Sequence, residues 1–203
     1  MKENTKRKFW FIRHAQSLTN ADTNIKSDDF GGGSVSLSEL GLKQAEDLAS
    51  IFLIPPDLLI TSFYVRTKQT AAPLIKKFPG ILQEEWKIHE FTYLSKEKCF
   101  NTTFSERRVW RDKFWQKADP MYCDGEGAES FTDFMNRLED AIEKLKKSRG
   151  KFVVLFSHEY VILAVKYLLE KKPKKITHKE MKDFRDYCLL NKIPNIGKLE
   201  IKF

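Results

Sequence analysis

The 203-residue sequence has few of the features that mark secreted or membrane proteins. Its three cysteines, Cys99, Cys123 and Cys188, are odd in number and show no C-x-x-C spacing, so we expect no disulfide framework. Its longest apolar runs, such as YVILAV at 160–165, are too short to cross a bilayer. The basic N-terminus is followed by four apolar residues before Arg13, which is too few for a signal-peptide core. These absences predict a cytoplasmic protein with reduced thiols and no membrane span.

Metal-binding patterns are also missing. The four histidines show no H-x-x-x-H spacing, and no acidic cluster suggests a magnesium site. The cysteine spacing does not indicate zinc. We therefore predict neither a metal nor a cofactor. Repeats, low-complexity tracts and linkers are equally lacking, so residues 1–203 are predicted to form a single domain.

The charge is strongly basic, with a formal net charge of +8 and a pI of about 9.3. Much of the excess lies in two stretches, 2–8 and 171–182, which are typical of solvated surfaces. A basic field also suits nucleic acid, an anionic surface or a small anionic substrate. Because no zinc-finger spacing or RNP-like strand accompanies the charge, we expect no specific nucleic-acid binding. The oligomeric state stays open.

Hydrophobic periodicity predicts strands that alternate with helices. Alternation of this kind indicates an α/β fold, and we predict a three-layer α/β/α sandwich with a mostly parallel sheet and an edge strand near the C-terminus. Within the second helix Pro73 is expected to kink the helix or end its first segment. The expected strands are 8–12, 55–62, 86–91, the first part of 151–170 and 197–203, and the expected helices are 38–52, 64–78, 129–150 and the rest of 151–170.

The first of these helices has Ser38 in the position of an N-cap. Its apolar stripe is expected to consist of Leu42, Ala45, Leu48, Ala49 and Phe52.

The segment 92–128 differs from the rest because it combines aromatic and basic residues. Trp110 and Phe114 are at helical spacing, so part of the segment is predicted to be a helix. Aromatic residues are more often core than ligand contacts. We nevertheless expect this segment to cover a pocket like a cap.

Polar residues follow the apolar strands at two distant places. His14 and His158 each end a predicted strand, and a third strand ends just before a helix that carries Arg66. Because the carboxyl ends of parallel strands meet at one rim, these residues and Arg13 are predicted to form a cationic pocket. Arginine grips phosphate with two donors, and an imidazole can attack phosphorus while another donates to the transferring oxygens.

Five segments resemble motifs of one family, in the family's order. RHAQSLTN (13–20) resembles the R-H-G-x-x-x-x-N signature of the histidine phosphatase superfamily, the phosphoglycerate-mutase-like proteins. SLSELGLKQA (36–45) and TSFYVRTKQTA (61–71) are similar to its P-L-T-x-x-G-x-x-Q-A and S-x-x-x-R-x-x-Q-T-A motifs. GAESF (127–131) and VVLFSHEYVI (153–162) resemble its G-E-S and second-histidine segments.

The resemblance implies a role for each pocket residue. His14 would be the nucleophile that becomes phosphohistidine, and Asn20 would assist the phosphoryl group. Glu90, in IHEFTYL, falls where the family keeps its proton donor. The groups that would surround the phosphoryl group are Arg13, Arg66 and His158.

The sequence departs from the family at three places. Ala15 replaces a glycine, Gln16 stands where glutamate is common, and Glu159 and Tyr160 follow His158 where glycines are frequent. These changes are expected to alter substrate preference rather than remove the chemistry.

Other polar residues have simpler interpretations. Glu129 and Ser130 are expected only to cap the helix that begins there. His89 and His178 are interpreted as structural or exposed.

The sequence therefore favours a metal-independent phosphatase that hydrolyses phosphomonoesters, with a small phosphorylated substrate as its partner. Phosphoglycerate mutase-type phosphotransfer is the alternative within the family, although mutases of this kind are usually longer. A third possibility is a non-catalytic module that binds phosphate or a phosphoprotein. The natural substrate is not defined by these motifs.

Overall fold

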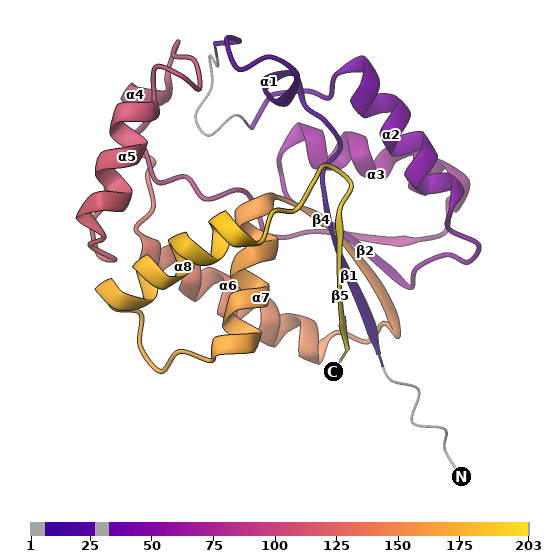
Figure 1. Cartoon of the computed structure of the whole chain (residues 1–203). Helices are drawn as coiled ribbons and strands as arrows, with labels where there is room; N and C mark the ends of the chain where they lie inside the picture. The colour runs from indigo at the N-terminus through magenta and orange to yellow at the C-terminus, as the bar shows by residue number, and fades with distance from the viewer. Residues whose placement is uncertain (1–6, 27–32, 203) are drawn as a thin grey trace.

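A five-stranded sheet forms the middle layer of the computed structural model, which describes residues 7–26 and 33–202 (Figure 1). Its strand order is β3-β2-β4-β1-β5. The first four strands are parallel, and β5 pairs antiparallel with β1 at one edge. The mostly parallel sheet with a C-terminal edge strand is thereby confirmed. The bounds are Lys8–Arg13 (β1), Leu58–Thr61 (β2), Leu82–Glu85 (β3), Phe152–Ser157 (β4) and Lys198–Lys202 (β5).

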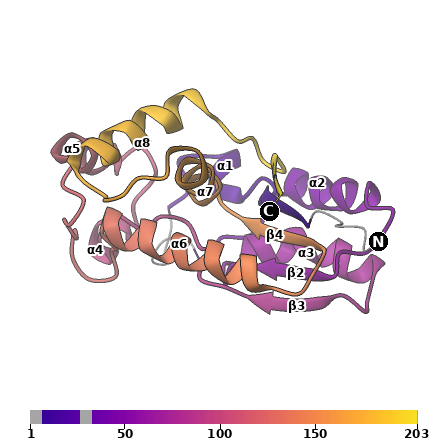
Figure 2. The ribbon, with the colours of Figure 1, turned by 90° about the horizontal axis from the view of Figure 1, so that it is seen from below.

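Helices cover both faces of the sheet, which confirms the three-layer arrangement (Figures 1 and 2). Side chains alternate between the two faces along a strand. In β1, Phe9 and Phe11 pack with helices α6 and α7, whereas Ile12 packs with α2 and α3. The central strands are apolar on both faces because both faces are buried. The helix bounds are Glu39–Ser50 (α2), Val65–Lys77 (α3), Phe131–Lys147 (α6) and Glu159–Lys171 (α7).

Helix α2 begins as its sequence predicts. The Ser38 hydroxyl accepts a hydrogen bond from the backbone N–H of Gly41 at 3.1 Å. The expected apolar stripe is correct for Ala45, Leu48, Ala49 and Phe52, which are buried, but wrong for Leu42, which is 49% exposed. One residue earlier, Gly41 lies against the backbone of Gln16. The buried face of α2 therefore starts at a glycine instead of at Leu42.

Helix α3 continues through Pro73 to Lys77, so Pro73 does not end the helix. Ala71 and Leu74, on either side of the proline, are buried against the sheet. Tertiary packing of this kind holds a helix together where a proline removes one of its hydrogen bonds.

The predicted strand at 86–91 is wrong. The edge strand beside β2 is instead β3. All four of its residues are exposed, and its sequence LQEE has no apolar pattern that would predict a strand. The segment after it is irregular, but Trp86 and Ile88 insert into the core. These two buried residues alternate with the exposed Lys87, which is the pattern of a half-buried strand. The segment instead crosses the carboxyl edge of the sheet and brings Glu90 to the pocket described below.

The basic stretch 171–182 is only partly a solvated surface, because helix α8 (His178–Leu190) begins within it. Thr177 caps this helix in a capping box with Glu180. Met181 and Phe184 are buried despite the surrounding charges. The stretch 2–8 lies largely outside the described residues.

The aromatic and basic segment 92–128 contains two helices, α4 (Lys96–Cys99) and α5 (Arg108–Lys117). The predicted helical spacing of Trp110 and Phe114 is confirmed in α5. In Figure 2, α5 lies beside α8 at the end of the molecule away from α2 and α3. Trp115 and Phe184 connect the two helices, with ring centroids 6.4 Å apart. Among the described residues, no helix combines the length and apolar character needed to span a membrane.

We predict that Gly41→Ala destabilises the protein by about 1–3 kcal/mol. A Cβ on Gly41 would lie 2.0 Å from the Gln16 carbonyl oxygen, and neither atom can move away without a shift of the backbone. This clash outweighs the gain in helix propensity of about 1 kcal/mol. Gly80→Ala is the control, because a Cβ there meets nothing within 4 Å. Urea unfolding measures both variants, and equal stability of the two would contradict the close approach.

Candidate active site

The site lies where parallel strands end. The register of β1 and β4 places Arg13 opposite Ser157, so His14 and His158 follow side by side. Their ring centroids are 5.1 Å apart. Arg66 reaches both rings from the first turn of α3, which follows β2. The structure thus brings together two histidines and an arginine that are far apart in sequence.

Arg66 connects the two imidazoles. Its Nε donates to His14 Nε2 at 3.1 Å, and its Nη2 lies 3.2 Å from His158 Nδ1. The guanidinium also stands over the Tyr64 ring, 4.6 Å from the centroid. Arg66 is buried, so its charge acts in a region of low dielectric where its effect on neighbouring groups is strong.

His14 is held as a neutral imidazole with a defined tautomer. Its Nδ1 lies 2.7 Å from the carbonyl oxygen of Ala15, which can only accept, so Nδ1 carries the proton. Nε2 then has the lone pair that accepts from Arg66. Burial lowers the pKa of His14 well below its usual value, and the charges of Arg66 and Arg13 lower it further. Nε2 therefore keeps an unprotonated lone pair at neutral pH.

His158 has the opposite tautomer. Because Arg66 can only donate, Nδ1 accepts, and Nε2 donates to the Ser62 hydroxyl at 2.8 Å. Burial lowers the pKa of His158 well below its usual value, followed by the charge of Arg66. The side chain has no exposed surface and lies behind Arg66.

Arg13 is turned partly away from the histidines. Its Nη1 donates to the carbonyl oxygen of Ile193 at 2.5 Å and lies 3.0 Å from Glu159 Oε2. Glu159 is one of the departures from the family pattern. Arg13 therefore shares its charge with a carboxylate at this position.

Asn20 lies on the short helix α1 (Leu18–Ala21) near the end of β1. Its Oδ1 accepts from the backbone N–H of Ser17 at 3.3 Å and from Asn195 Nδ2 at 3.2 Å. The same Asn195 nitrogen donates to the carbonyl oxygen of His14 at 3.0 Å. Asn195 thus links Asn20 to the backbone of His14.

Glu90 is partly buried on the segment that follows β3. Its Oε1 accepts the backbone N–H of Phe91 at 3.0 Å. Burial raises the pKa of Glu90, whereas that hydrogen bond and the charges of Arg66 and Arg13 oppose the rise. The net direction is upward, which favours a protonated carboxyl group compared with an exposed glutamate.

An ion pair fixes the segment that carries Glu90. The Glu129 carboxylate receives two bonds of 2.7 Å from Arg137 and a third, of 3.0 Å, from the backbone N–H of Thr92. Arg137 also donates to the carbonyl oxygens of Lys87 and His89. The interpretation of Glu129 as only a helix cap is therefore wrong. The cap of α6 is made by Ser130 in a capping box with Asp133, and Glu129 takes no part in it.

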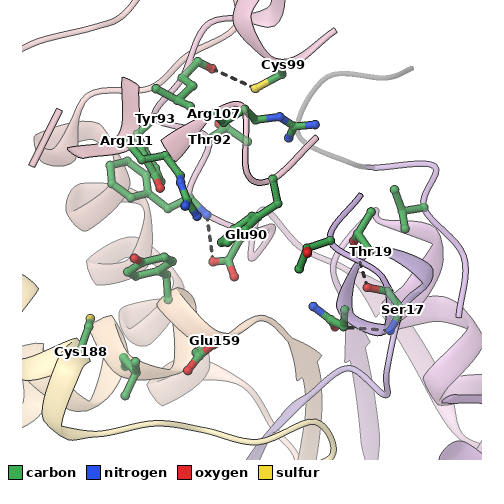
Figure 3. Close-up of a pocket in the computed structure, with 18 of the residues that line it drawn as sticks. Ser17, Thr19, Glu90, Thr92, Tyr93, Cys99, Arg107, Arg111, Glu159 and Cys188 are labelled. Atoms are coloured by element: carbon green, nitrogen blue, oxygen red, sulfur yellow. Dashed lines mark hydrogen bonds between the residues drawn. The ribbon is translucent and has the colours of Figure 1, made fainter. Parts of the chain in front are cut away.

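A cavity of about 550 Å³ opens at this rim (Figure 3). Its walls include five of the predicted site residues, namely Arg13, His14, Asn20, Arg66 and Glu90. Glu90 lies in the middle of the view, between Arg107 and Arg111 on one side and Ser17 and Thr19 on the other (Figure 3). Within the described residues, no three His, Cys, Asp or Glu side chains are grouped so as to hold a metal ion.

Three residues of the site carried no separate prediction. Ser62 stands inside a quoted motif, so its position before the helix was a usable signal for a partner of His158. Glu159 follows His158 directly and was noted only as a departure. Asn195 had no signal, because 181 residues separate it from His14. His89 packs on Phe63 and burial lowers its pKa to about 4, consistent with a structural role.

Comparison with known proteins identifies the family. The model of the histidine phosphatase superfamily (branch 1) matches residues 9–193. The chain therefore belongs to the histidine phosphatase superfamily.

A curated relative and solved structures agree with this assignment. A probable fructose-2,6-bisphosphatase of Schizosaccharomyces pombe is 27% identical over 154 residues, which cover 73% of this chain and 35% of that protein. This chain thus spans about a third of the length of that relative. A mycobacterial glucosyl-3-phosphoglycerate phosphatase in complex with VO3 has a TM-score of 0.70 at 21% identity, covering 96% of this chain and 92% of the other.

A second similar structure is a phosphoserine phosphatase from Entamoeba histolytica in complex with 3-phosphoglyceric acid. It has a TM-score of 0.68 at 19% identity and covers 95% of this chain and 89% of its own. At such identities the solved structures show a shared fold.

We predict that Arg137→Met lowers the free energy of unfolding by about 3–5 kcal/mol, because it leaves the largely buried Glu129 carboxylate without its partner. The two side chains are 13% and 15% exposed. Arg108→Met is the matched control, since the Arg108–Asp112 pair is 77% and 50% exposed. That substitution should cost less than about 1 kcal/mol. Similar losses in both variants by urea unfolding would show that Arg137 does not hold the Glu90 segment.

Proposed function

We propose that the protein is a phosphatase that hydrolyses phosphomonoesters without a metal ion, through a phosphohistidine on His14. The observation that carries the proposal is the neutral His14, whose unprotonated Nε2 faces the Arg66 guanidinium at the wall of the cavity. A phosphate oxygen is a stronger acceptor for Arg66 than an imidazole nitrogen. Substrate binding would therefore draw the Arg66 donors from the rings to the phosphate and free the lone pair of Nε2.

In the first step, His14 Nε2 attacks phosphorus in line with the leaving oxygen. The N–P bond forms as the P–O bond to the alcohol breaks, and Glu90 transfers its proton to the departing oxygen. In the second step, water gives its proton to the Glu90 carboxylate and attacks phosphorus. The N–P bond then breaks and inorganic phosphate leaves, which restores neutral His14 and protonated Glu90.

The cationic groups stabilise the charge on the transferring oxygens. Arg66 and Arg13 supply the charge that a metal ion provides in other phosphoryl-transfer sites. The pKa of His158 is low beside Arg66, but a dianionic phosphate nearby raises it, because an opposite charge favours the protonated imidazole. His158 then becomes a donor toward the phosphoryl group. Asn20 and Asn195 hold the backbone of His14 in place.

The raised pKa of Glu90 supports its role as the acid. Glu159 contributes to this rise through its negative charge. The phosphatase names of the similar proteins favour hydrolysis over the phosphoglycerate mutase-type alternative. Turnover of p-nitrophenyl phosphate in the presence of EDTA distinguishes a metal-independent phosphatase from a non-catalytic phosphate-binding module. The phosphatase should retain this activity, whereas the module should show none.

We predict that His14→Ala lowers turnover on the order of 10³-fold or more, because the nucleophile is lost. Wild-type protein quenched during turnover of radiolabelled substrate should carry label that acid removes, since phosphohistidine is acid-labile. Circular dichroism confirms that the variant is folded. Label that survives acid, or that persists in the variant, would exclude His14 as the nucleophile.

We predict that Glu90→Gln slows the hydrolysis of alkyl phosphates about 10²- to 10³-fold. An alkoxide leaves only when protonated, whereas p-nitrophenolate leaves without a proton. Transfer of the phosphoryl group from p-nitrophenyl phosphate to His14, measured as the first burst of p-nitrophenolate, should therefore change little. In the wild type, kcat for alkyl phosphates should fall as pH rises through the raised pKa of Glu90, because the acid ionises. The variant should lack this decline. Equal losses in the rate of phosphoryl transfer to His14 from both substrates would assign Glu90 another role.

A further inference from the structure

The cavity extends beyond the proposed phosphoryl site to a second group of cations. Arg107 and Arg111 reach its wall from α5, and Arg185 reaches it from α8. Arg111 stands four residues after Arg107 and four before Trp115, so the three side chains share one face of α5. Trp115 also lines the cavity. This face of α5 thus presents two guanidinium groups to the same cavity as His14.

Each of these arginines is held in place by neighbouring groups. Arg107 Nε donates to the Thr102 hydroxyl at 2.9 Å. The Arg111 guanidinium lies 3.6 Å from the centroid of the Phe104 ring. In α8, Arg185 donates to the Tyr160 hydroxyl at 2.9 Å and lies 5.1 Å from the Trp115 ring centroid.

The described residues do not neutralise these arginines. Within residues 7–26 and 33–202, none of the three has a carboxylate oxygen at ion-pair distance. Asp112 also lines the cavity, but it lies 3.7 Å from Arg108 instead. Arg111 Nε is buried and has no hydrogen-bond partner among the described residues. A buried donor without an acceptor costs free energy, which an anion at this point would recover.

The placement is also unfavourable for α5 itself. A helix N-terminus is stabilised by acidic residues, and α2, α6, α7 and α8 each have one in the first turn. Helix α5 has none, and its N-terminal end carries Arg107, Arg108 and Arg111. The positive end of the helix dipole therefore adds to the field of the arginines on this side of the cavity. Repulsion among these charges is relieved when an anion binds.

We propose that Arg107, Arg111 and Arg185 form a second anion-binding subsite, and that the substrate is a small phosphomonoester carrying another anionic group, a phosphate or a carboxylate, at its far end. This inference rests on the proposed function of the His14 site. In Figure 3, Glu90 lies between Arg107 and Arg111 on one side and Ser17 and Thr19, which follow His14 in the sequence, on the other. An ester that reaches from His14 to these arginines would therefore place its bridging oxygen near Glu90. A cavity of about 550 Å³ fits a small phosphorylated metabolite.

The test uses matched series of substrates, because their length reports the separation of the two subsites. One series consists of n-alkyl monophosphates, and the other of α,ω-alkanediol bisphosphates from ethanediol to octanediol. A third series replaces the second phosphate with a carboxylate. The wild type should show a higher kcat/KM for one length of doubly anionic substrate than for the matching monophosphate. The doubly anionic series with the higher kcat/KM shows whether the second subsite prefers a phosphate or a carboxylate.

Arg111→Gln and Arg185→Gln should each lower this preference, expressed as the ratio of the two kcat/KM values, by about 10- to 100-fold, which corresponds to one charged hydrogen bond. Arg108→Gln is the control, because it removes a positive charge from the same helix outside the cavity lining. Its ratio should match the wild type. A wild type without preference at any length, or an unchanged ratio in both arginine variants, would overturn the subsite.

A binding measurement separates this proposal from the phosphatase proposal. Calorimetry on the His14→Ala protein should show tighter binding of the preferred bisphosphate than of the alkyl monophosphate, and Arg111→Gln in that background should remove the difference. Selective binding without turnover by the wild type would support the subsite and reject hydrolysis. Turnover of p-nitrophenyl phosphate without selectivity in either assay would reject the subsite and leave the phosphatase standing.

Discussion

The contact of one buried guanidinium with two imidazoles is the constraint on which the site depends. Arg66 can only donate, so each histidine must offer it an unprotonated nitrogen. The other nitrogen of each ring then needs an acceptor, which Ala15 and Ser62 provide. The tautomers and the orientation of both rings follow from this arrangement, and the charge of Arg66 adds to the burial that lowers both pKa values. A lysine at the same position could not contact both rings with a planar fork.

The strand pairing of the sheet positions the residues that make this contact. Parallel pairing of β1 and β4 places the two histidines beside each other, and β2 delivers Ser62 and the start of α3 to the same rim. The approach of α2 through Gly41 supports the loop after His14. The pair Glu129–Arg137 holds the irregular segment that carries Glu90. Each supporting contact lies outside the cavity wall, yet each determines where a reactive atom lies.

Charge is distributed unevenly around the cavity. Near His14, the positive charge of Arg13 is balanced in part by Glu159, which also favours the protonated state of Glu90. On the side formed by α5 and α8, the arginines have no such balance from residues 7–26 and 33–202, and α5 carries basic residues where acidic ones would stabilise it. Natural proteins keep unfavourable charges of this kind where a ligand compensates for them. This distribution supports the proposal that the departures from the family pattern and the segment 92–128 concern substrate choice more than the phosphoryl chemistry.

The sequence by itself determined the layered fold, because strands buried on both faces must be apolar throughout and helices on a sheet need one apolar stripe. The polar residues at the ends of those strands, His14, His158 and the nearby Arg66, could be predicted to meet for the same reason. The strand β3 could not be predicted, because an exposed edge strand needs no apolar pattern. Helix α8 was only partly predictable, because basic residues surround its buried side chains.

Only the tertiary structure decided which hydrogen bonds the site makes. The bond from Asn195 to His14, the pairing of Arg13 with Glu159, and the convergence of Arg185 with Arg111 join residues that no local pattern relates. Such contacts depend on how helices and loops from distant parts of the chain pack together. Local sequence encodes hydrophobic period and turn chemistry, whereas the direction of a polar side chain is set by the neighbours that packing supplies.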